Sequence, residues 1–134
     1  MVKNYKSILK LLSFILYTNS LDYSIIDKEL KNIDLENLSK NFIKLRELKA
    51  EIFQRPDLTF LRNMGDCDDF VTMTAYICQK KNINYKIGFK IKDNIVYHIF
   101  IKVENKIIDP WEAVQDGNEL FFDLKNFVER LQVW

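Results

Sequence analysis

The spacing of apolar residues predicts helices in the first part of the chain. Tyr5, Ile8, Leu12 and Ile15 recur at intervals of three or four residues, which places them on one face of a helix. A second, shorter pattern of this kind covers residues 25–32. Residues 1–56 are therefore predicted to form a helical N-terminal portion.

A longer helix is predicted to begin after Asp34, whose carboxylate can accept hydrogen bonds from the N–H groups of a first helical turn. Apolar residues then recur at helical spacing, and Pro56 is expected to end the helix because proline cannot continue the backbone hydrogen bonding. The apolar positions of this predicted helix are Leu35, Leu38, Phe42, Leu45 and Leu48.

The segment Gly65-Asp66-Cys67-Asp68-Asp69-Phe70 has the signature of a helix start. Asp66 is a suitable N-cap, and Asp69, three residues later, completes a pattern like a capping box. Cys67 would then be the first residue inside the helix, which should end near residues 80–82. The helix face continues through Phe70, Val71, Thr74 and Cys78.

Three strand-like runs follow. Residues 85–92 alternate apolar and polar side chains, residues 95–103 form a second run, and residues 106–109 form a short third run that Pro110 ends. The pairs Asp93-Asn94 and Glu104-Asn105 are turn signals between the runs. Lys86, Lys90 and Lys92 are interpreted as a solvated strand face. For the tail, Leu124, Phe127, Val128 and Leu131 favour a final helix.

If both turns are two-residue loops, Phe89 opposes His98 and Phe100 opposes Asp109. His98 and Asp109 then become diagonal neighbours on one sheet face, with side chains within hydrogen-bond reach. The helix that begins at Cys67 is expected to cover this face. The face would hold Tyr85, Ile87, Phe89, Ile91, Val96, His98, Phe100, Ile107 and Asp109. The opposite face would hold Ile95, Tyr97, Ile99, Ile101 and Ile108.

Composition narrows the class of protein. The chain has 134 residues, of which 48% are hydrophobic, so a single domain over residues 1–134 with one core is expected. Only three glycines are present, which excludes Gly-rich loops for phosphates or dinucleotides. The net charge of +1 gives no indication of a nucleic-acid partner. We expect an α+β fold.

Two cysteines and one histidine remain as candidate reactive groups. Cys67 and Cys78 fall in one predicted helix, roughly 16 Å apart, which is too far for a disulfide and consistent with a reducing compartment. Two cysteines and one histidine on scattered elements make a poor zinc site.

The N-terminus has Lys3, Lys6 and Lys10 before a short apolar run. We interpret it as a retained amphipathic helix rather than a cleaved signal peptide. A cytoplasmic location without membrane contact is therefore expected.

Cys67, His98 and Asp109 together suit nucleophilic catalysis. A helix N-terminus and a nearby imidazolium both favour the thiolate of a cysteine, which is its nucleophilic form. Histidine can carry the proton to a leaving group, and a carboxylate on its other ring nitrogen fixes its tautomer. Each residue also has an ordinary interpretation: a buried apolar cysteine, a satisfied core histidine and a turn aspartate. Cys78 is interpreted as a packing residue.

These motifs resemble the transglutaminase-like superfamily of papain-related enzymes. The resemblance rests on Gly65-Asp66-Cys67-Asp68-Asp69, on His98 in a hydrophobic strand and on Ile108-Asp109-Pro110, and it covers residues 64–111. It implies a Cys-bearing helix packed on a small antiparallel sheet, with Cys67 as nucleophile, His98 as base and Asp109 as the residue that orients His98. It further implies thiol-dependent acyl transfer or hydrolysis on a peptide or protein substrate, with no cofactor. Compact members with this motif resemble those of bacteria and phages.

Several alternatives stay open at this stage. The rival interpretation is a non-catalytic interaction or assembly module, in a phage or virion for example, that keeps the same fold. The backbone N–H of Cys67 can supply one oxyanion donor, whereas a second is not identified; Gln54 lies thirteen residues upstream and Asn63 four. The substrate, the choice between hydrolysis and transfer, and the oligomeric state are likewise open.

Overall fold

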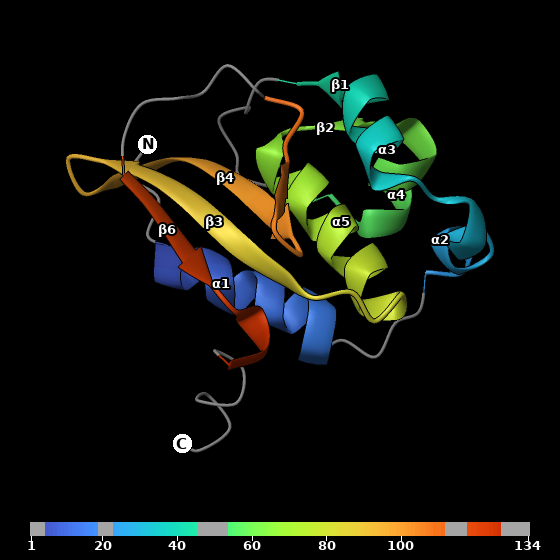
Figure 1. Cartoon of the computed structure of the whole chain (residues 1–134), viewed down its shortest axis with the longest axis horizontal. Coiled ribbons are helices and arrows are strands. Elements are labelled where there is room, and N and C mark those ends of the chain that lie inside the picture. The colour runs from blue at the N-terminus through green and yellow to red at the C-terminus, as the bar shows by residue number, and fades with distance from the viewer. Residues whose placement is uncertain (1–4, 19–22, 46–53, 112–117, 127–134) are drawn as a thin grey trace.

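The protein has an α+β architecture in which helices pack against a four-stranded antiparallel sheet (Figure 1). The computed structural model describes residues 5–18, 23–45, 54–111 and 118–126. The strand order in the sheet is β5-β4-β3-β6. Its strands are β3 (Tyr85–Lys92), β4 (Ile95–Val103), β5 (Lys106–Ile108) and β6 (Asn118–Phe122).

The first predicted helix is confirmed as α1 (Tyr5–Ser13), which continues into a π-helical turn, η1 (Phe14–Thr18). Its apolar face is buried through Ile8, Leu9 and Leu12. The ring of Tyr5 stacks on Phe122, with 5.3 Å between ring centroids, so α1 packs against the sheet near β6. The second helical pattern is confirmed as two short elements, α2 (Ser24–Asp27) and η2 (Leu30–Asn32).

The long helix predicted from Asp34 towards Pro56 ends after seven residues, and residues 46–53 of the prediction lie outside the described residues. Asp34 does cap α3 (Leu35–Asn41), accepting the N–H groups of Glu36 and Asn37, but Phe42 turns to an extended conformation. Leaving the helix lets the Phe42 ring pack on Phe70, with 5% of Phe42 exposed. The predicted position at Leu45 lies after the helix, and Leu48 lies outside the described residues.

Phe42 instead leads into β1 (Ile43–Lys44), which pairs in parallel with β2 (Met64–Gly65). Pro56 begins α4 (Pro56–Arg62) rather than ending a helix, because proline suits a first turn whose N–H groups have no helical partner. Asn63 then ends α4 in the left-handed conformation, with φ of 50°.

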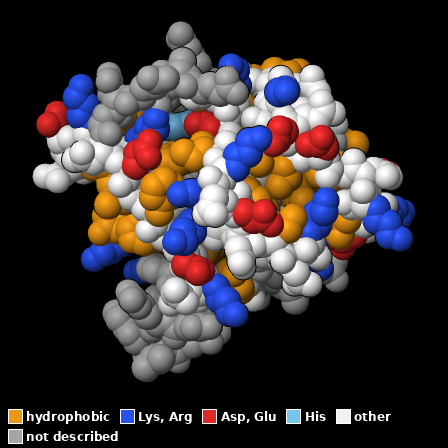
Figure 2. Space-filling view, viewed as in Figure 1, with side chains coloured by type: hydrophobic (Ala, Val, Ile, Leu, Met, Phe, Trp, Pro, Cys, Tyr) orange, Lys and Arg blue, Asp and Glu red, His pale blue; other side chains and the backbone are white. Residues whose placement is uncertain are grey.

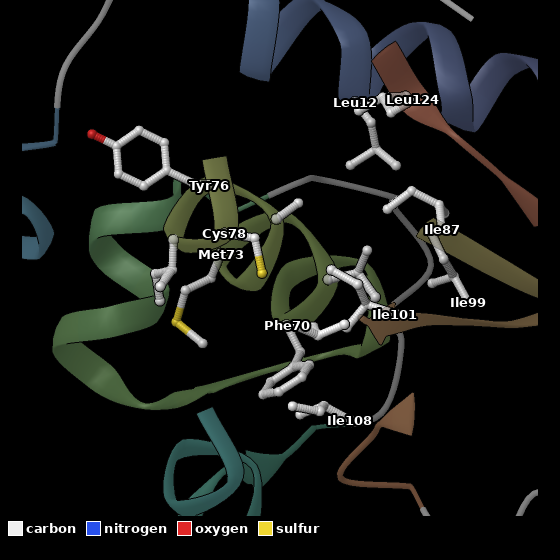
Figure 3. Close-up of a cluster of buried hydrophobic side chains, with 14 of the residues drawn as sticks. Leu12, Phe70, Met73, Tyr76, Cys78, Ile87, Ile99, Ile101, Ile108 and Leu124 are labelled. Atoms are coloured by element: carbon white, nitrogen blue, oxygen red, sulfur yellow. The ribbon is translucent and has the colours of Figure 1, made fainter. Parts of the chain in front are cut away.

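The helix predicted at the Gly-Asp-Cys segment is confirmed as α5 (Cys67–Lys80). Eleven consecutive residues, from Asp68 to Cys78, are buried. Such burial on all sides is expected of a helix covered by several elements. The sheet contacts α5 chiefly through β4, and α4 also packs against it. Figure 3 shows Phe70 of α5 close to Ile101 and Ile108 of the sheet.

The predicted bounds of β3 and β4 are confirmed, and β5 ends one residue before its predicted end at Asp109. β6 was not predicted. It pairs antiparallel with β3 at the sheet edge. Residues 124–126 are helical, in agreement with the start of the predicted final helix, whose positions Phe127, Val128 and Leu131 lie outside the described residues.

The pairing of β3 with β4 corrects the predicted sheet faces. Lys92 opposes Ile95, as a two-residue loop at Asp93-Asn94 requires, but the register then shifts, so that Lys90 rather than Phe89 opposes His98. Tyr97 is the extra residue of a β-bulge, and one extra residue reverses the face of every residue that follows it. Phe89 consequently opposes Ile99.

The bulge divides the predicted apolar face between the two sides of the sheet. His98, Phe100 and Ile107 lie on one side with Gly88 and Lys90, contrary to the prediction. The other side packs against α1 and α5 and forms the main core (Figure 3), so the expectation that the helix beginning at Cys67 covers the His98 face is wrong. From the sheet, this core includes Ile87, Phe89, Val96, Ile99, Ile101, Val103 and Ile108.

Candidate functional site

The start of α5 is fixed by a reciprocal capping box. The Asp69 N–H donates to Asp66 Oδ1 at 3.0 Å, and the Asp66 N–H donates to Asp69 Oδ2 at 3.1 Å. The other carboxylate oxygen of Asp69 accepts the Gln54 N–H at 2.7 Å. Asp69 therefore fastens the segment before α4 to the first turn of α5, where Cys67 lies as the first, half-buried helical residue.

Gly65 makes room for Asp69. A Cβ atom at Gly65 would lie 2.7 Å from Asp69 Cβ and 2.8 Å from Asp69 Oδ2, which is closer than such atoms approach. The Gly-Asp-Cys-Asp-Asp order thus has a physical reason at three positions: Gly65 gives space, Asp66 caps and Asp69 completes the box.

The charges at this helix end bear on the thiol. Burial raises the pKa of Asp66 to about 7, the hydrogen bond from the Asp69 N–H opposes this, and the carboxylates of Asp69 and Asp68 add to it. Near neutral pH, Asp66 is therefore partly protonated and repels a neighbouring Cys67 thiolate less than an ordinary aspartate would. The helix N-terminus itself favours the thiolate.

Cys78 has a different environment from Cys67. It is fully buried in α5, and burial raises the pKa of its thiol to about 12. Neither cysteine forms a disulfide, as the sequence predicted. Cys78 is thus a core residue in the neutral form.

His98 and Asp109 are in direct contact, as the β4–β5 register predicted. His98 Nε2 lies 2.8 Å from Asp109 Oδ2, and the two side chains are 5% and 10% exposed. Asp109 Oδ1 accepts the Trp111 N–H at 3.0 Å. Both carboxylate oxygens of Asp109 are therefore engaged. Nδ1 is the ring nitrogen of His98 that does not take part in the bond to Asp109.

Aromatic rings connect this pair to the first turn of α5. The His98 ring lies 6.0 Å from the Trp111 ring, and Trp111 lies 6.0 Å from Phe42. Phe42 in turn makes an edge-to-face contact with Phe70 at 4.9 Å. Phe70 is three residues after Cys67, so this chain of rings runs from His98 to the first turn of α5.

Lys90 belongs to the surroundings of His98, which the sequence did not indicate. It opposes His98 across the sheet, and its side chain is only 12% exposed, so its interpretation as part of a solvated face is wrong. Its ammonium lies 5.8 Å from the centre of the Phe100 ring and 3.8 Å from Glu119 Oε1. The burial of Lys90 follows from the bulge and from β6, neither of which the alternation of residues 85–92 reveals.

The two side chains considered as oxyanion donors are engaged elsewhere. Gln54 Nε2 donates to Thr59 Oγ1 at 2.8 Å and to the Met64 carbonyl at 3.0 Å. Asn63 Nδ2 donates to the Asn41 carbonyl at 2.9 Å. The backbone N–H of Cys67 therefore stays as the candidate donor.

Within the described residues, no group of three or more His, Cys, Asp or Glu side chains is arranged to hold a metal ion. Over the same part of the chain, no helix has the length and apolar character needed to cross a membrane. On the face shown in Figure 2, basic and acidic side chains are interspersed, in keeping with the net charge of +1.

Neither a family model nor a curated protein matches the sequence. Among solved structures, the chain is similar to a crystal structure of a proposed cysteine protease from Cytophaga hutchinsonii, with 14% sequence identity and a TM-score of 0.37. The match covers 87% of this chain and 48% of the other, so this chain spans about half the length of that protein. At this identity and TM-score, the similarity carries no argument about activity.

Proposed function

We propose that the protein performs thiol-dependent acyl transfer or hydrolysis on amide or peptide bonds. Cys67 is the nucleophile, His98 the general base and acid, and Asp109 the residue that orients His98. The observation that supports this best is the buried bond of 2.8 Å between His98 Nε2 and Asp109 Oδ2. It fixes one ring nitrogen on a carboxylate, as a base in nucleophilic catalysis requires.

The proposed reaction has two halves. His98 Nδ1 takes the proton of the Cys67 thiol, and the thiolate attacks the carbonyl carbon of the amide. The resulting oxyanion accepts a hydrogen bond from the Cys67 N–H at the start of α5. Collapse of the intermediate breaks the C–N bond, the imidazolium gives its proton to the leaving amine, and a thioester remains on Cys67.

A second nucleophile then resolves the thioester. Water gives a carboxylic acid, which is the reaction of a peptidase or amidase, whereas an amine gives a new amide. In both cases His98 takes a proton from the incoming nucleophile, and the Cys67 thiolate leaves. Both reactions share the first half, so product analysis with and without an added amine distinguishes them.

Alkylation of the two cysteines at different pH values tests the proposal. Iodoacetamide labelling of Cys67 and Cys78, resolved by mass spectrometry, should be fast at Cys67 below pH 7 and absent at buried Cys78. In His98→Ala, the Cys67 profile should move towards that of a free thiol, with a pKa of roughly 8.5. An ordinary profile in both proteins would refute the proposed site.

A non-catalytic interaction or assembly module is the second candidate. The observation that favours it is the engagement of Gln54 Nε2 with Thr59 and Met64, which removes that side chain as an oxyanion donor. The same alkylation experiment separates the candidates, because a binding module has no need of an activated thiol at Cys67.

A further inference from the structure

The short segment formed by residues 42–44 lies between the two parts of the candidate site. It belongs to the N-terminal portion of the chain, outside the segment 64–111 that carries Cys67, His98 and Asp109. Phe42 is 5% exposed, and its ring contacts the rings of both Phe70 and Trp111.

The backbone fastens this segment to the start of α5. The Ile43 N–H donates to the Asn63 carbonyl at 2.9 Å, and the Leu45 N–H donates to the Gly65 carbonyl at 2.8 Å. Gly65 is followed directly by the Asp66 cap and by Cys67. Phe42 is therefore held to the Cys67 turn twice, by the β1–β2 pairing and by its ring contact with Phe70.

The same segment also reaches the turn that follows β5. Lys44 Nζ donates to the Pro110 carbonyl at 3.3 Å, and the Phe42 ring packs on Trp111. Trp111 donates its N–H to Asp109 and packs against the His98 ring. Residues two apart on a strand point to the same side, which explains how Phe42 and Lys44 reach one turn.

We propose that Phe42 is a positioning residue of the site, an inference that rests on the proposed function. The His98–Asp109 bond is made between β4 and the end of β5, so it does not depend on Phe42. What Phe42 sets is the distance and orientation between that pair and the first turn of α5. A smaller side chain leaves a gap between Phe70 and Trp111, and the two parts can then shift relative to each other.

The test compares Phe42→Leu with Phe89→Leu. Phe89 is also buried, at 0% exposed, but it lies on the other side of the sheet from His98, and its ring contacts are with Tyr5 and Phe122. Each variant is assayed for its thermal midpoint and for the rate of Cys67 alkylation between pH 5.5 and 9. The alkylation assays are run at a temperature well below the lower of the two variants' thermal midpoints, with His98→Ala measured in parallel.

Both leucine variants should lower the thermal midpoint, because each loses buried aromatic contacts. Only Phe42→Leu should slow Cys67 alkylation at pH 6, about tenfold, with a pH profile shifted towards a free thiol. Phe42→Met, which keeps more of the side-chain length, should restore part of the rate, and it replaces Phe42→Leu if that variant does not fold.

The outcomes separate this inference from the proposed function. If His98→Ala changes the Cys67 profile and the two leucine variants alter it equally or not at all, Phe42 has no positioning role and the proposed function stands. If His98→Ala leaves the profile unchanged, the proposed function fails, and the inference fails with it.

Discussion

Gly65→Ala gives a sharp test of how the start of α5 is built. The added Cβ would lie 2.7 Å from Asp69 Cβ, against an ordinary contact of 3.4 Å or more, so Asp69 must move by several tenths of an ångström. The movement weakens the bonds from the N–H groups of Asp66 and Gln54. Hydrogen bonds to a charged acceptor contribute about 1.5–3 kcal/mol each, and water replaces part of this, so we expect a loss of about 3 kcal/mol.

The expected change in thermal midpoint follows from the size of the chain. For 134 residues, the unfolding entropy near 60 °C is about 0.28 kcal/mol/K, so a loss of about 3 kcal/mol lowers the midpoint by about 11 °C. Circular dichroism melts of the wild type, Gly65→Ala and the exposed control Lys40→Ala measure this. The control should stay within about 1 °C of the wild type. A Gly65→Ala midpoint within about 3 °C of the wild type would refute the close packing of Gly65 on Asp69.

Three further predictions concern single side chains. The folded-state pKa of Asp66, about 7, exceeds its ordinary value of 3.8, so the stabilising contribution of Asp66 is complete below pH 4 and is lost as the pH rises through 7. Asp66→Asn keeps the helix cap, so its free energy of unfolding in urea should equal that of the wild type at pH 4. At pH 8 it should exceed the wild-type value by about 1–2 kcal/mol, after allowance for screening. An equal difference at both pH values would contradict this. Lys90→Ala should cost about 1 kcal/mol because it removes a mostly buried side chain whose ammonium lies near the Phe100 ring, and Lys90→Met should cost less than about 0.5 kcal/mol; equal losses would assign the effect to charge. Cys78→Ser should lower the free energy of unfolding by about 1–3 kcal/mol in the same assay, because it places a hydroxyl in a fully buried site. An unchanged free energy would show that the hydroxyl finds a hydrogen-bond partner there.

Local chemistry explains what could be predicted from the sequence. The capping box needs only Asp66 and Asp69 three residues apart, and both the helix start and the position of Cys67 follow from it. The Glu104-Asn105 turn likewise fixes the β4–β5 register, and that register brings Asp109 next to His98. These parts of the candidate site depend on neighbours close in sequence.

The features that sequence reasoning missed depend on distant contacts. The apolar spacing typical of a helix continues past Asn41 in the sequence. In the structure, Phe42 leaves the helix and packs on Phe70 and Trp111, which come much later in the chain. The bulge at Tyr97 has no signal in residue type, yet it moves His98 to the other side of the sheet. The strand at residues 118–122 lacks alternation, and its pairing with β3 determines it.

The chemistry at Cys67 can be tested most directly by trapping an acyl-enzyme. Wild type, Cys67→Ala and His98→Ala are mixed with p-nitrophenyl acetate, and each is analysed by rapid quench and peptide mass spectrometry. We expect a burst of nitrophenolate and an acetyl thioester on Cys67 in the wild type, with slow or no acylation in His98→Ala and none in Cys67→Ala. An absence of acetyl on Cys67, or equal acylation in the wild type and His98→Ala, would contradict the proposed acyl-transfer site.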